Sequence, residues 1–89
     1  MSPIINDDEL LVLYKIISEN GTLSREAVGD TKNLDSLIAK QFVDESKSQG
    51  IVSVNINGRW KYSTIVGHAH FGTNIPHHIR RLMQIKGIK

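Results

Sequence analysis

The sequence IVSVNINGRWKYSTIV, residues 51–66, decides the fold class. Two runs rich in β-branched and aromatic residues flank the pair Asn57-Gly58. An Asn-Gly pair between alternating runs is a strong local indicator of a β-hairpin, because both residues tolerate the left-handed conformation of a tight turn. The stretch therefore predicts a two-stranded hairpin whose tip lies at these two residues.

The register of this hairpin follows from the pattern of apolar residues. A two-residue turn places Val54 opposite Lys61, whereas a three-residue loop with Gly58 in the left-handed position places Val54 opposite Trp60. The second register gathers the apolar side chains on one face and is therefore favoured. It leaves Arg59 and Lys61 facing solvent or a ligand.

The aromatic pair Trp60 and Tyr62 has two interpretations. Aromatic side chains on a hairpin over a small helical core usually fill space, and this interpretation is favoured. The alternative is that the rings stack on unpaired nucleic-acid bases.

Helices are predicted on the N-terminal side of the hairpin. Asn6 and Glu9 have the spacing of a capping box, and Asn20-Gly21 is a stop. The apolar spacing of the following residues continues the helical pattern up to Gly50. The three helices expected are Leu10–Ile17, Ser24–Asp30 and Asn33–Ser48.

A further amphipathic helix is predicted over residues 75–87, after the hairpin. Pro76 suits the first turn of a helix, and Gly87 suits its end. Its apolar stripe of Ile79, Leu82 and Met83 either closes the core or pairs with a second copy of the chain.

Charge is segregated along the chain. Residues 1–50 hold all nine carboxylates and five Lys/Arg, a net charge of −4, while residues 51–89 hold six Lys/Arg and no carboxylate, a net charge of +6. A positive field without internal acids favours a polyanionic partner, of which nucleic acid is the commonest. The chain of 89 residues is long enough for one domain with a thin core.

The order helix, short helix, longer helix, hairpin resembles the winged-helix branch of the helix-turn-helix domains, over roughly residues 7–66. The resemblance implies an α+β fold with three N-terminal helices, a two-stranded hairpin wing and, here, a C-terminal helix. It also implies binding of double-stranded DNA by a small transcriptional regulator. In this family the third helix enters the major groove, and the wing contacts the backbone or the minor groove.

The resemblance assigns DNA contacts to individual positions. Asn33 is expected to read adenine, Lys40 to bind phosphate and Arg59 to enter a narrow minor groove. The basic C-terminal helix adds two arginines to these positions. The candidate DNA-binding residues are Lys32, Asn33, Ser36, Lys40, Asn57, Arg59, Lys61, Arg80 and Arg81. A homodimer through the C-terminal helix is also expected, since two half-sites raise affinity.

The sequence also permits functions other than DNA binding. The main alternative is a protein-interaction module that docks an acidic protein, as an adaptor or inhibitor of a host or polymerase component. His68 and His70, with His77 and His78 nearby, favour a pH-dependent positive charge over a metal site, because no cysteine or nearby acid completes a ligand set. No motif of an enzyme or cofactor site occurs. The chain lacks a signal peptide or a spanning segment, so an intracellular, cytoplasmic location is expected.

Overall fold

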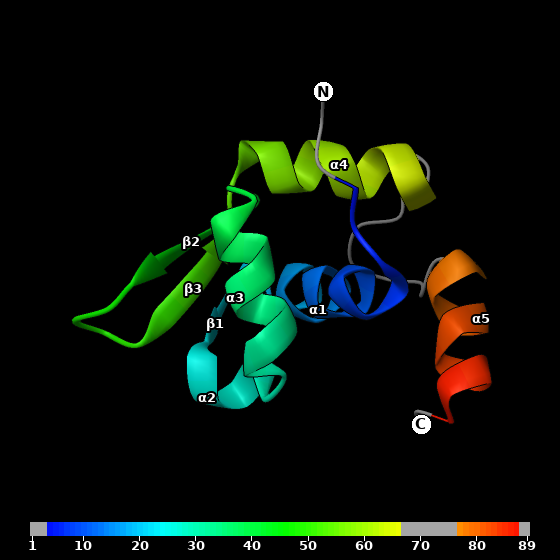
Figure 1. Ribbon diagram of the computed structural model, residues 1–89, viewed down its shortest axis with the longest axis horizontal. Coiled ribbons are helices and arrows are strands. Elements are labelled where there is room, and N and C mark those ends of the chain that lie inside the picture. The colour runs from blue at the N-terminus through cyan, green and yellow to red at the C-terminus, as the bar shows by residue number, and fades with distance from the viewer. Residues whose placement is uncertain (1–3, 67–76, 88–89) are drawn as a thin grey trace.

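The computed structural model describes residues 4–66 and 77–87. This part of the chain has an α+β fold with five helices and one three-stranded antiparallel sheet (Figure 1). The elements in chain order are α1 (Asp7–Ser18), β1 (Thr22–Ser24), α2 (Arg25–Val28), α3 (Thr31–Ala39), β2 (Val43–Ser46), β3 (Ile51–Val54), α4 (Ile56–Val66) and α5 (His77–Lys86). None of the helices in the described part is long and apolar enough to cross a membrane.

Helix α1 lies at the centre of the molecule and packs against α3, α4 and α5 (Figure 1). Its predicted capping box is confirmed: the backbone N–H of Glu9 donates to Asn6, and the backbone N–H of Asn6 donates to Glu9. The side chains of Leu13 and Ile16 are fully buried, and each contributes about 1.5–3 kcal/mol by leaving water. The predicted stop is also confirmed, since the chain turns at Gly21 (φ +85°).

The sheet has the strand order β1-β3-β2, and its only tight hairpin in the described residues joins β2 to β3. Val43 pairs with Val54 and Ser46 pairs with Ile51. Gly50 supplies the positive φ (+65°) that the turn between these strands requires. The hairpin therefore lies one strand earlier in the chain than the sequence predicted.

The expected helix over Asn33–Ser48 is wrong in its second half, because α3 ends at Ala39. The N–H of Gln41 donates to the carbonyl of Ile38 (3.0 Å), and the N–H of Phe42 donates to that of Leu37 (3.1 Å). These two bonds form a Schellman motif with Gln41 in the left-handed conformation (φ +68°). This position usually holds glycine, so the helix stop was not visible in the sequence.

The second strand predicted within residues 51–66 is also wrong, because residues 56–66 form α4. The side chain of Asn55 accepts a hydrogen bond from the N–H of Gly58 (2.9 Å), which is an N-cap. The same amide donates to the carbonyl of Gln41 (2.8 Å) and to Asp44 (3.2 Å). Asn55 thus starts a helix where the Asn-Gly pair predicted a turn, and the tertiary bonds of its side chain favour that outcome.

Helix α5 closes the core against α1 and α4. Ile79 and Leu82 are buried, and Met83 packs against the core at its edge. Of the two roles expected for this apolar stripe, the structure shows the first. A homodimer stays a prediction, but the buried part of the stripe is not free to form it.

Candidate functional site

The exposed face of α3 is polar at the N-terminal half of the helix. Leu34 and Leu37 are fully buried, and the side chains of Thr31, Lys32 and Asp35 are exposed. Within the described residues, Lys32 forms no ion pair. This half of the helix therefore presents polar groups to a ligand while its other side anchors it in the core.

Asn33 is held by the residue that caps α3. Its backbone N–H donates to Oδ1 of Asp30 (3.2 Å), and its side-chain Nδ2 donates to Oδ2 of Asp30 (2.7 Å). Both bonds are exposed to solvent. The Asn33 amide nitrogen carries two N–H groups, so one can donate to an adenine base while the other donates to Asp30.

Ser36 and Lys40 point to a buried carboxylate rather than to a ligand. The side chain of Glu9 is 1% exposed. It accepts hydrogen bonds from Ser36 Oγ (2.7 Å) and from Lys40 Nζ (2.8 Å). The Lys40 ammonium also donates to the carbonyl oxygen of Ile4 (2.8 Å). The positive charge of Lys40 is therefore neutralised inside the protein.

These contacts change the acidity of Glu9. Burial alone would raise the pKa of Glu9, but the hydrogen bonds from Lys40, Ser36 and the Asn6 backbone outweigh it and lower the pKa below its ordinary value of 4.5. The ion pair thus favours the charged carboxylate in the folded state.

We expect the free energy of unfolding to decrease as the pH falls below about 4.5. A carboxylate whose pKa is lower in the folded than in the unfolded state stabilises the fold above its unfolded pKa, and this contribution is lost as the pH falls through the folded pKa. This decrease is measured by urea unfolding, monitored by circular dichroism, at pH values between about 6 and 3. The Glu9→Gln variant should have a flatter profile, and equal profiles for both proteins would refute this origin of the acid sensitivity.

Arg25 connects α2, α3 and the β2–β3 hairpin. Its Nη2 donates to Asp35 on α3 (2.6 Å), and its Nε donates to Glu45 on β2 (2.6 Å). The hydrogen bonds to Glu45 and Asp35 raise the pKa of Arg25, which is charged in any case. The three side chains link the hairpin to the exposed face of α3 through two ion pairs.

The hairpin adds one unpaired cation to this region. Lys47 is exposed in the turn between β2 and β3, and it forms no ion pair within the described residues. The hairpin projects from the body of the molecule beside α2 and α3 (Figure 1). The exposed acids of the same region are Glu26, Asp30, Asp35 and Asp44. The positive charge available here is consequently small.

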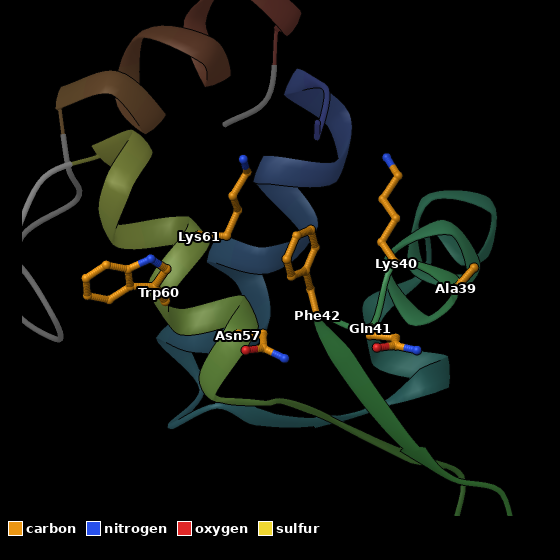
Figure 2. A pocket seen from close by; sticks show the side chains of 7 residues that line it. All are labelled: Ala39, Lys40, Gln41, Phe42, Asn57, Trp60 and Lys61. Carbon is orange, nitrogen blue, oxygen red and sulfur yellow. The ribbon is translucent and has the colours of Figure 1, made fainter. Parts of the chain in front are cut away.

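Asn57 and Lys61 lie on α4, not on a hairpin wing. Both line a cleft of about 400 Å³ between α4 and the segment that follows α3. Figure 2 shows their side chains. Lys40, Gln41 and Phe42 form its other side. The cleft thus unites three of the predicted residues, although the charge of Lys40 is already neutralised by Glu9.

Arg59 and the two arginines of α5 lie apart from the exposed half of α3. A Cβ added at Gly21 would overlap the Arg59 guanidinium, so that group lies over the turn that follows α1. Arg80 and Arg81 are exposed on α5, across the molecule from the hairpin (Figure 1). The predicted basic residues therefore do not form one continuous surface.

Sequence reasoning missed the roles of Glu9 and Arg25. The capping box located Glu9 at the start of α1, but its burial depends on α3 packing across that end. Trp60 was expected in the core and is 69% exposed, whereas Tyr62 is buried as expected, and its burial raises its pKa to about 12. In the predicted strand, side chains two residues apart lie on the same face, so both rings were expected together. In a helix, residues two apart point in different directions, and the rings are separated.

The histidine segment His68-Ala69-His70 lies outside the described residues, as do the side chains of His77 and His78. Residues 4–66 and 79–87 contain no cluster of three or more His, Asp or Glu side chains that could hold a metal ion. No family model, curated protein or solved structure matches the chain. The functional argument therefore depends on the geometry alone.

Proposed function

We propose that the chain is a winged-helix protein that binds double-stranded DNA as a small transcriptional regulator. The order α1-β1-α2-α3-β2-β3, with a sheet in which β3 is central, resembles that class of domain. The β2–β3 hairpin takes the place of the wing, and α4 and α5 follow it. The wing is thus assigned to residues 43–54.

One observation carries this proposal: Arg25 bridges Asp35 of α3 and Glu45 of β2. A helix that reads bases and a hairpin that contacts the backbone must keep a fixed spacing to fit one duplex. The bridge supplies this spacing before DNA binds, which reduces the ordering cost of association. Thr31, Lys32 and Asn33 are then the side chains nearest the base edges, and Lys47 contacts the backbone.

The charge of this surface predicts modest affinity. Among the described residues, Lys32 and Lys47 are the unpaired cations of this surface, and the exposed acids Glu26, Asp30, Asp35 and Asp44 lie in the same region. Each chain therefore neutralises at most about two phosphates, and log K should fall against log salt with a slope no steeper than about −2. For a single chain we expect neither high affinity nor a steep dependence of the affinity on salt. Two chains on neighbouring half-sites would double the slope and explain how such a surface selects a target.

The proposal is tested by polarisation titrations of a labelled random duplex at several salt concentrations. Replacing Lys32→Gln together with Lys47→Gln should weaken binding and remove about one unit of slope for each lysine. The matched control is Arg80→Gln with Arg81→Gln, which removes two exposed cations from α5 and should leave the slope unchanged. If the α5 variant loses the slope and the first variant keeps it, the assigned surface is wrong.

The alternative function, a protein-interaction module, is favoured by a separate observation on α4. That helix exposes large apolar side chains which DNA binding does not use.

A further inference from the structure

Helix α4 exposes an apolar strip on its outer side. Ile56 is 81% exposed and Trp60 is 69% exposed. They are four residues apart, so they lie one above the other on the same face. The opposite face is the buried one, since Gly58 and Tyr62 pack into the molecule. Large apolar groups adjacent to each other in water are typical of an interface.

The strip has positive charge on both sides. At 100° per residue, Arg59 lies on one side of the Ile56–Trp60 line and Lys61 lies on the other. Neither forms an ion pair within the described residues, and α4 contains no carboxylate. An apolar centre with a charged rim is the usual anatomy of a protein–protein interface, where Trp and Arg are enriched.

We infer that the outer face of α4 docks an acidic amphipathic segment of a partner protein. Its apolar side chains cover Ile56 and Trp60, and its carboxylates pair with Arg59 and Lys61. The Arg59 guanidinium already lies over Gly21, so part of its ordering cost is met before binding. This function goes beyond DNA binding and uses a different surface, because α4 lies away from α2 and the hairpin tip (Figure 1).

Two other occupants fit the face less well. A single-stranded nucleic acid would stack on Trp60, but Ile56 offers no π-face for a second base, and the nearby charge of Lys40 is neutralised by Glu9. A second copy of the chain, paired through α4 about a two-fold axis, would bring the cations of both copies together. An acidic partner satisfies both the apolar strip and its rim.

The test uses the full chain and random peptides displayed on phage. The library is first depleted of peptides that bind an Ile56→Ser variant and is then selected on the wild-type protein. The selected peptides should be rich in Asp and Glu, with apolar residues at helical spacing. Because Trp60 is the single tryptophan of the chain, binding of a synthetic copy should shift its fluorescence to shorter wavelength. The variant Arg59→Gln with Lys61→Gln should bind about tenfold more weakly, which corresponds to two partly exposed ion pairs.

The control Arg80→Gln with Arg81→Gln should keep wild-type affinity for the peptide. Circular dichroism shows whether each variant remains folded, which is expected since Ile56, Arg59, Arg80 and Arg81 are exposed and Lys61 is only partly buried. The inference is overturned if no peptide depends on Ile56, if the selected peptides lack acidic residues, or if the α5 control loses affinity equally. It is also overturned if a single-stranded oligonucleotide, or self-association of the chain, shifts Trp60 more strongly than the peptides. No DNA duplex is present, so these outcomes leave the DNA proposal untouched.

Discussion

Replacing Lys40→Met should destabilise the protein by about 3 kcal/mol at neutral pH. The substitution keeps an unbranched apolar side chain that is shorter by the ammonium group, and it leaves the Glu9 carboxylate, which is 1% exposed, without a counter-ion. Breaking a buried ion pair by removing one partner is costly because the remaining charge must stay buried or take up a proton. For a domain of this size the loss is a large fraction of the total stability. Urea unfolding measures it directly.

Two companion variants isolate the cause. Combining Lys40→Met with Glu9→Gln should recover much of the loss, because glutamine is neutral and still accepts the Asn6 N–H in the capping box. Lys32→Met removes an exposed lysine from α3, the helix that Lys40 caps at its C-terminal end, and should change stability by no more than about 0.5 kcal/mol. If the double variant is no more stable than Lys40→Met alone, the buried charge is not the source of the effect.

The Gly58→Ala variant should lose at least about 2 kcal/mol of stability, although alanine is the better helix former. A Cβ at this position would overlap the backbone carbonyl oxygen of Phe42 and press on Val54. The Phe42 carbonyl cannot move freely, since it accepts the N–H of Asn55 (3.1 Å). Thermal unfolding should therefore show a clear decrease in Tm.

The matched control is Asn57→Ala, one residue earlier in α4 and exposed. It tests the effect of alanine in this turn without the steric conflict, and it should be neutral or slightly stabilising. A Gly58→Ala protein as stable as the wild type would show that α4 does not approach Phe42 as closely as described.

The starts of α1 and α2 could be predicted because their causes are local, whereas α3 begins at Thr31 with Asp30 as its N-cap, two residues before the expected start at Asn33. The capping box of Asn6 with Glu9 and the N-cap at Ser24, which accepts the N–H of Ala27 (3.2 Å), depend on residues within one turn. The stop at Asn20-Gly21 is equally local. Such features do not require knowledge of the tertiary fold.

The hairpin could not be placed because its determinants are distant in sequence. Asn57-Gly58 has the composition of a hairpin turn, but Asn55 caps a helix there and bonds to Gln41 and Asp44 across the loop after α3. The strand β2 was read as helix because Phe42 and Val43 also fit the helical spacing of α3. The pairing of β2 with β3 favours a strand over a helix at these residues.

The candidate site was only partly predictable for a related reason. Charge segregation in the sequence counts all cations equally, whereas in the fold Lys40 is neutralised by Glu9 and Lys86 by Asp8 (2.6 Å). Trp60 is exposed because of the helical spacing of the residues in α4. The hairpin interpretation assumed instead that side chains alternate between two faces, as in a strand. Net charge along a chain therefore overestimates the charge that a ligand meets.

The central claim, that the first turns of α3 and the β2–β3 hairpin bind a DNA duplex, is tested most directly by NMR. Adding a short duplex to the 15N-labelled protein should shift the backbone amide signals of residues 31–36 and of the turn between β2 and β3. Those of α5 should stay unchanged. Shifts confined to α4 and α5, with α3 and the hairpin unaffected, would contradict the account.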